Sequence, residues 1–296
     1  FSYREGKKLI FLHHLNKFPV SPIFIPANKL DWITKTFEKG ADSIILDLED
    51  SVSENEKVEA RENLFLHLKE NKYKGNLIVR VNPIDGDLGL EDIHKLNQPD
   101  LCIDAFMLPK IEDSIEISKL PEINVIALLE TPRSINNISD IASQEKVKGL
   151  ALGGADLSAS LGSTMDWDSL LYSRSKIILE SSIHNLFSID SPFMDIENLE
   201  SLELESRKAR SIGFSGKAAI HPSQLDVINR SFLPGNDEIE EAKKIIKAFS
   251  SSSSAVISFE GKMIDQPIIL SMEKRLRLVG ICLLYTSPSP RDLMRS

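Results

Sequence analysis

Eight short runs of apolar, often β-branched residues recur along the chain, and longer helix-like stretches, such as residues 54–70 and 168–184, separate them. Strands that are apolar through most of their length are typical of a parallel sheet whose faces are covered by helices. Eight such units over about 200 residues are the number in a (β/α)8 barrel, so we expect an α/β fold of the TIM-barrel type. The runs read VSPIFIP, SIILDLE, NLIVRVN, CIDAFMLP, INVIALLE, KGLALGG, NLFSID and GKAAIH.

The composition narrows the class of protein. The 296 residues are 42% hydrophobic and 27% charged, which is typical of a globular chain with a large core and excludes a disordered one. The formal net charge of −9 argues against nucleic acid or an anionic membrane as a partner. No apolar run approaches the ~20 residues of a membrane helix, and Cys102 and Cys282 lie far apart without metal-ligand spacing. We therefore expect a cytoplasmic protein, or a mitochondrial matrix protein in a eukaryote.

The chain divides into four segments. Residues 1–19 begin without methionine and are basic, so we expect a truncated or non-native N-terminus. Residues 20–234 contain the eight runs of the predicted barrel. Residues 235–281 contain a helix-like stretch, five consecutive serines that indicate a flexible linker, and a short β-type run, so we expect a lid-like extension. Residues 282–296 begin with CLLYTSPSPRD, which resembles a translated sequencing adapter, so we expect an artefact without a packed role.

Polar side chains stand where the predicted strands end, which is the end of a (β/α)8 barrel that carries the chemistry. Clustered carboxylates would be costly in a dry core. We therefore expect them to share a rim with basic side chains and a cation. In chain order the rim residues are Asp47, Glu49, Asp50, Arg80, Asn82, Lys110, Glu130, Asp156, Asp190 and His221.

Glu130 and Asp156 are the candidate metal ligands. They end neighbouring predicted strands, so their side chains can converge on one point. Two carboxylates, completed by water and a chelating substrate, suit Mg2+. The residues alone leave a second interpretation open, in which Glu130 caps the following helix and Asp156 is an ordinary loop acid.

Arg80 lies on an apolar strand and needs a carboxylate there. It either binds substrate or forms an ion pair with Asp47 or Glu49 that merely fastens two strands. We expect one or both acids to orient Arg80 and metal-bound water.

Weaker signals surround these residues. Gly153 and Gly154 permit close approach of the backbone, or form a plain tight turn. His221 is expected to orient a loop rather than to act as a base. Cys102 begins a predicted strand, and His13 and His14 fall in the suspect N-terminus, so we assign them no chemistry.

Six segments in this order and spacing resemble the HpcH/HpaI aldolase and citrate lyase family: LDLEDSV, VRVNP, MLPKIED, LLETPRS, GGADLSASLG and GFSGKAAIHPSQ. The later segment FEGKMIDQP is similar to an element of the branch that acts on acyl-CoA. The resemblance implies that Glu130 and Asp156 bind Mg2+, with Mn2+ as the alternative, and that Arg80 binds the substrate. Gly154, where the backbone permits close approach, and the two metal ligands Glu130 and Asp156 are also expected to bind the substrate.

The resemblance further implies a carbon–carbon lyase that cleaves a 3-hydroxyacyl-CoA thioester, such as malyl- or citramalyl-CoA, to acetyl- or propionyl-CoA and a 2-oxo acid. Asp265 would be the general acid/base, reaching the site of a neighbouring subunit in a homo-oligomer, typically a trimer. Asp265 could instead cap the last helix. Asn28 and Lys29, after the first predicted strand, are candidates for binding CoA. The alternatives are a citrate lyase β subunit acting on a carrier-bound citryl group, and a non-catalytic scaffold barrel.

Overall fold

The computed structural model describes residues 19–252, 254–277 and 279–280. The chain divides into two compact units, Phe1–Phe232 and Leu233–Ser296. Residues 1–18 with His13 and His14, and residues 281–296 with Cys282, lie outside the described residues.

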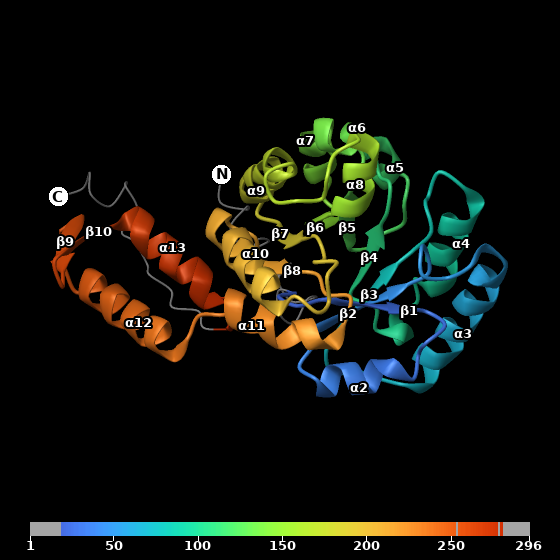
Figure 1. Ribbon diagram of the computed structural model, residues 1–296, viewed down its shortest axis with the longest axis horizontal. Coiled ribbons are helices and arrows are strands. Elements are labelled where there is room, and N and C mark those ends of the chain that lie inside the picture. Colours follow the sequence, from blue (N-terminus) through green and yellow to red (C-terminus); the bar gives the residue numbers. More distant parts are fainter. Residues whose placement is uncertain (1–18, 253, 278, 281–296) are drawn as a thin grey trace, which may run out of the picture. The chain divides into compact units, whose positions relative to one another are not determined.

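The first unit is built around one parallel sheet of eight strands, which lie side by side in chain order (Figure 1). The sheet closes on itself, because Ile23 of the first strand pairs with Ala219 after the last, and the N–H of Phe24 donates to the Ala219 carbonyl at 3.0 Å. This confirms the predicted (β/α)8 barrel. The strands are β1 (Ile23–Pro26), β2 (Ser43–Asp47), β3 (Asn76–Arg80), β4 (Ala105–Leu108), β5 (Val125–Leu129), β6 (Val147–Leu152), β7 (Phe187–Asp190) and β8 (Gly216–Lys217).

Helices follow the strands and surround the sheet (Figure 1). The predicted helix at 54–70 is a 3-10 turn that continues into α3, and the one at 168–184 begins three residues later, with α9. The α-helices are α2 (Trp32–Glu38), α3 (Lys57–Glu70), α4 (Asp87–Leu96), α5 (Ser114–Ser118), α6 (Pro132–Asn136), α7 (Ile138–Ala142), α8 (Gly154–Leu161), α9 (Leu171–His184), α10 (Leu199–Ile212) and α11 (Leu225–Phe232). The 3-10 turns are η2 (Glu54–Glu56), η3 (Pro99–Leu101) and η4 (Pro222–Gln224).

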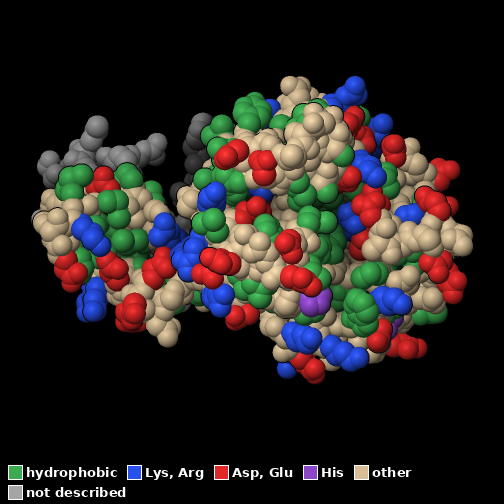
Figure 2. All heavy atoms as spheres, in the orientation of Figure 1, with side chains coloured by type: hydrophobic (Ala, Val, Ile, Leu, Met, Phe, Trp, Pro, Cys, Tyr) green, Lys and Arg blue, Asp and Glu red, His purple; other side chains and the backbone are tan. Residues whose placement is uncertain are grey.

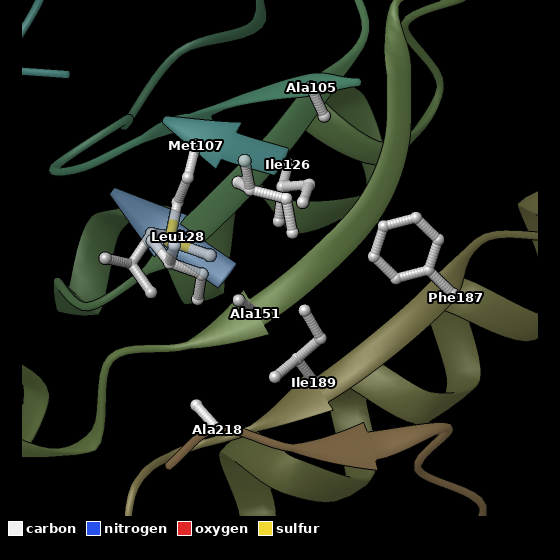
Figure 3. Packing of buried hydrophobic residues seen from close by; sticks show 10 residues of the cluster. Ala105, Met107, Ile126, Leu128, Ala151, Phe187, Ile189 and Ala218 are labelled. Carbon is white, nitrogen blue, oxygen red and sulfur yellow. The ribbon is translucent and has the colours of Figure 1, made fainter. Parts of the chain in front are cut away.

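The barrel interior is a packed hydrophobic cluster, not a pore (Figure 3). Alternate residues of a strand point inward, so β2 to β7 each contribute one or two side chains to it, while Ala218 follows β8 and Phe24 of β1 packs against the cluster. Gly149 makes room for the ring of Phe187, because a Cβ at Gly149 would lie 2.2 Å from that ring. The cluster comprises Ile45, Ile78, Ala105, Met107, Ile126, Leu128, Ala151, Phe187, Ile189 and Ala218.

The second unit is an antiparallel hairpin between two helices. Its elements are α12 (Asn236–Ser250), β9 (Val256–Phe259), β10 (Lys262–Asp265) and α13 (Gln266–Arg277). Glu260 and Gly261 both have positive φ, as the two-residue turn of a hairpin requires. The unit has its own core, which includes Ile245, Phe249 and Ile264. The expected linker is shorter than the serine run, because Ser250 still belongs to α12.

Cys102 lies outside the strands. Cys102 does not begin a strand: it ends η3 in a left-handed conformation and is exposed, and β4 starts at Ala105. Within the described residues, no helix is both long and apolar enough to cross a membrane. On the face seen in Figure 2, acidic and basic side chains are interspersed.

Candidate active site

A cavity of about 390 Å³ opens at the carboxyl ends of the barrel strands. Its floor continues the interior cluster, with the side chains of Phe24, Met107, Leu128, Ile189 and Ala218. Its polar wall includes the side chains of Asp47, Asp50, Arg80, Glu130 and Asp156, together with Gly153 and Gly154. The structure therefore brings together most of the predicted rim residues around one space that is apolar on one side and charged on the other.

Arg80 ends β3 and is held by three acids of the β2 segment. Its Nε and Nη2 atoms donate to the two oxygens of Asp47 at 2.7 and 2.6 Å, which is a bidentate pair. Its Nη1 atom lies 3.1 Å from Glu49 and 3.3 Å from Asp50. Burial would raise the pKa of Asp47, but the Arg80 guanidinium lowers it below its usual value. Both predicted acids, Asp47 and Glu49, thus orient Arg80.

Glu49 also reaches the residue that follows β4. Its Oε1 atom accepts a hydrogen bond from the Lys110 Nζ at 2.8 Å. Burial raises the pKa of Glu49, against the lowering effect of Arg80 and Lys110. Lys110 itself has a left-handed backbone, with φ of 53°, which is uncommon for a residue with a side chain.

Glu130, directly after β5, is fixed by two neighbouring strand ends. Its Oε1 atom accepts the backbone N–H of Lys110 at 2.7 Å. On the other side, a Cβ at Gly153 would lie 2.5 Å from its Oε2 atom, so glycine is required for this packing. The helix-capping interpretation of Glu130 does not hold, because Thr131 is the N-cap of α6.

The charges around the cavity fit a divalent cation. Burial, and then the negative charges of Glu49 and Asp156, raises the pKa of Glu130 to about 8. Asp156 lies in the first turn of α8 and lines the same cavity. Within the described residues, no group of three or more His, Cys, Asp or Glu side chains forms a complete metal cluster. Glu130 and Asp156 can thus hold Mg2+ only with water and substrate completing the shell, as this ion commonly allows.

Other predicted residues lie elsewhere. Asn28 and Lys29 are exposed beyond the end of β1 and do not line the cavity. The N–H of Ile268 donates to Asp265 Oδ1 at 3.3 Å, the contact of a helix cap, and Asp265 belongs to the second unit. His221 Nδ1 accepts the N–H of Ser223 at 3.2 Å, which is the loop-orienting role expected of it.

Sequence reasoning missed a buried charge cluster beside the cavity. Asp190 contacts the cavity but is fully buried, with Lys217 Nζ at 2.7 Å and Arg174 Nε at 2.8 Å. Lys217 also binds Glu205 at 2.6 Å. The sequence did contain a signal for this cluster. Lys217 is a charged residue within an apolar run, and its neighbour Ala218 lines the cavity. Its side chain therefore points away from the barrel axis, toward the helices.

Comparisons with known proteins agree with this geometry. Residues 21–222 match the family model described as HpcH/HpaI aldolase/citrate lyase. A citrate lyase subunit beta-like protein of Mycobacterium tuberculosis is 31% identical over 275 residues, covering 87% of this chain and 94% of that protein. A (3S)-malyl-CoA thioesterase of Cereibacter sphaeroides is 30% identical over 266 residues, covering 86% and 93%.

A human protein and a crystal structure are also similar. The mitochondrial citramalyl-CoA lyase of Homo sapiens is 29% identical over 285 residues, covering 86% of this chain and 84% of that protein. The crystal structure of CitE from Mycobacterium tuberculosis, in complex with magnesium, acetoacetate and coenzyme A, superposes with a TM-score of 0.76 at 30% identity. It covers 90% of this chain and 99% of the crystallised one.

Proposed function

Because the chain belongs to the HpcH/HpaI aldolase/citrate lyase family, we propose that it is a Mg2+-dependent carbon–carbon lyase that acts on a 3-hydroxyacyl-CoA thioester. Its products would be acetyl-CoA or propionyl-CoA and a 2-oxo acid, with malyl-CoA and citramalyl-CoA as the leading substrates. One observation carries the proposal: Glu130 and Asp156 line the same cavity as a guanidinium that three acids hold in place.

The chain's own residues supply binding and orientation. Arg80 lies at the cavity wall and would bind the carboxylate or carbonyl oxygen of the oxo-acid half of the substrate. The backbone at Gly154 is buried and lines the cavity, so substrate can approach it closely. Bound Mg2+, held by Glu130 and Asp156, would stabilise negative charge on the hydroxyl oxygen of the substrate while the C–C bond breaks. Mn2+ prefers the same oxygen ligands and is expected to substitute.

The acyl half needs a proton. When the bond between C2 and C3 of the thioester breaks, its electron pair stays on the carbon that becomes the acetyl methyl group. The hydroxyl proton leaves to water as its O–H electron pair becomes the second bond of the oxo acid carbonyl, and a general acid must protonate the carbon that becomes the methyl group. We assign this role to Asp265, delivered by the second unit to the cavity of a neighbouring subunit in a homo-oligomer, with a trimer as the expected form. Its bond to the N–H of Ile268 would hold the carboxylate in a fixed orientation.

The CoA moiety would lie outside the cavity. Asn28 and Lys29 follow β1, are exposed, and stand at the same end of the barrel as the cavity, so they are candidates for its phosphate and amide groups. The expected location remains cytoplasmic, or the mitochondrial matrix in a eukaryote.

The test is product analysis on a panel of thioesters with and without Mg2+. Malyl-CoA, citramalyl-CoA and citryl-CoA are incubated with the protein, and mass spectrometry identifies acyl-CoA, oxo acid and free CoA. A lyase gives acyl-CoA and oxo acid in equal amounts, only with the metal. Free CoA with an intact hydroxy acid would indicate a thioesterase instead, which is the activity named for the Cereibacter relative.

Two other outcomes separate the remaining alternatives. Turnover of citryl thioester only when it is attached to a carrier protein would indicate a citrate lyase β subunit. No turnover on any thioester, together with no effect of Mg2+ on Tm, would favour a non-catalytic scaffold barrel.

A further inference from the structure

The backbone of the turn after β2 is held by hydrogen bonds to its N–H groups and to its carbonyl oxygens. The Asp47 carboxylate accepts the backbone N–H groups of Glu49 at 3.0 Å and Ser51 at 3.2 Å. From α3, the Lys57 ammonium donates to the carbonyl oxygens of Leu48 at 3.2 Å and Glu49 at 2.9 Å. Because this turn presents the Glu49 carboxylate to Arg80, its geometry helps to decide where the guanidinium is held.

Lys57 is an unusual residue for a first helical turn. It is only 7% exposed, and it does not line the cavity. Its third hydrogen bond goes to Asn82 Oδ1 at 2.7 Å, so all three go to neutral oxygen atoms. A buried ammonium is costly unless its hydrogen bonds are complete. The contacts therefore point to a residue whose job is to fix the groups that it binds.

Asn82 ties this ammonium to the strand that carries Arg80. It follows β3 two residues after Arg80, and its Nδ2 and backbone N–H donate to Asp92 at 2.7 and 3.0 Å. Asp92 in turn accepts from Arg61 Nη1 at 3.2 Å. The ends of β2 and β3 are thus joined to α3 and α4 by one buried polar chain that ends at Lys57.

We propose that Lys57 is a positioning residue for Arg80, acting by fixing the Leu48 and Glu49 carbonyls so that the Glu49 carboxylate holds the guanidinium toward the cavity. The proposal rests on the substrate-binding role proposed for Arg80. It does not require Lys57 to touch substrate or metal. Its loss leaves the cavity lining intact and acts only through the turn.

The first experiment asks whether Lys57 fixes the turn after β2, and it needs no substrate. Hydrogen exchange is measured for the peptide that spans residues 47–53 in the wild type and in Lys57→Met. Exchange should rise in this peptide, because the N–H of Val52 donates to the same Glu49 carbonyl that Lys57 binds. Lys57→Gln, which keeps one donor, serves if the methionine variant does not fold. Lys146→Met is the matched control and should leave this peptide unchanged, because it removes an ammonium that lies directly before β6, at the other end of the barrel, and donates to the Ser118 and Leu120 carbonyls.

The second experiment measures kcat/KM on the thioester that the wild type cleaves. Lys57→Met should lower kcat/KM by about 10- to 100-fold, because a small misplacement of a binding group has that effect. Pyruvate with Mg2+ should also raise its Tm less than that of the wild type. Lys146→Met should keep kcat/KM within about twofold, since its contacts lie at the end of the barrel opposite the cavity.

A double-variant cycle identifies the route of the effect. If Lys57 acts through Glu49, combining Lys57→Met with Glu49→Gln should cost no more than about twofold beyond the worse single variant. Three results would each overturn the proposal: losses in kcat/KM that multiply fully in the double variant, unchanged exchange in residues 47–53 of Lys57→Met, or an equal loss of kcat/KM in Lys146→Met. A wild type without any turnover would contradict the proposed function instead, and the exchange result would still decide whether Lys57 fixes the turn.

Discussion

At the scale of single residues, Arg80 carries the clearest geometric argument. Its planar group meets both oxygens of Asp47 at 2.6 and 2.7 Å, and Glu49 and Asp50 approach its remaining nitrogen. The Phe24 ring lies 5.0 Å from its central carbon, which adds a cation–π contact. A side chain held on so many sides is pre-organised for a planar partner such as a carboxylate.

Arg80→Lys should therefore fail although the charge is kept. An ammonium cannot make the bidentate pair with Asp47 and still face the cavity. We expect kcat/KM to fall by at least about 100-fold, the loss typical when one aligned donor is removed. Arg133→Lys, at a side chain that is 71% exposed, is the matched control and should stay near wild type. Near-wild-type turnover in Arg80→Lys would reduce Arg80 to an ion pair between strands.

Gly153 gives a second prediction at this scale. In Gly153→Ala the new Cβ would lie 2.4 Å from the Cβ of Glu130 and 2.5 Å from its Oε2 atom, so the carboxylate must move. We expect Mg2+ affinity to fall by about 10- to 100-fold, as when groups that orient a ligand are changed. Gly86→Ala, where a Cβ meets nothing within 4 Å, is the control in the same titration. Unchanged affinity in Gly153→Ala would show that Glu130 is not held in this way.

At the scale of elements, β7 and β8 are joined to α9 and α10 by the buried cluster of Arg174, Asp190, Glu205 and Lys217. The pairs balance two positive charges with two negative ones. Removing one member of a buried pair leaves a charge without compensation, which costs far more than the pair contributes.

Asp190→Asn should accordingly destabilise the protein by about 3–5 kcal/mol at pH 7, measured by urea unfolding. Burial would raise the pKa of Asp190, but Lys217 and Arg174 lower it below its ordinary value of 3.8. A lowered carboxyl pKa contributes stability above pH 3.8 that is lost as pH falls through the folded pKa. The difference in the free energy of unfolding between Asp190→Asn and the wild type should therefore shrink as the pH falls below 3.8. Asp226→Asn, at an exposed pair, should cost little, and an equal loss there would contradict the argument.

The strands could be predicted because most of them are buried along their whole length and read as one apolar run, and all eight are found. The ends of these runs also located Asp47, Arg80, Glu130 and Asp156 correctly at one cavity. The partners of Lys217 could not be predicted, because they come from the end of β7 and from α10, which only the folded chain brings together. The same holds for Lys57, whose neighbours Leu48, Glu49 and Asn82 follow two different strands.

At the scale of the whole molecule, the chain consists of a complete barrel unit and a helix–hairpin–helix unit with its own core. The second unit carries exposed apolar side chains, among them Val256, Met263 and Leu270. Sequence predicted this unit through its β-type run and Pro267, which lies in the first turn of α13.

Subunit mixing tests the proposed role of Asp265. Arg80→Ala and Asp265→Ala proteins should each be inactive. Mixed under exchange conditions, they should regain activity, because some sites then combine Arg80 of one subunit with Asp265 of another. Native mass spectrometry confirms the mixed oligomers. If such oligomers form and no activity returns, Asp265 does not act between subunits.

The central claim is that Glu130 and Asp156 together hold Mg2+ at the end of the barrel. Calorimetric titration of Mg2+ into the wild type, Glu130→Gln and Asp156→Asn tests it directly, with Asp140→Asn, at an exposed position of α7, as the control. The account predicts one saturable site in the wild type and the control. It predicts no binding in either site variant over the same range, with both variants folded by circular dichroism. Wild-type affinity in Glu130→Gln or Asp156→Asn would contradict it.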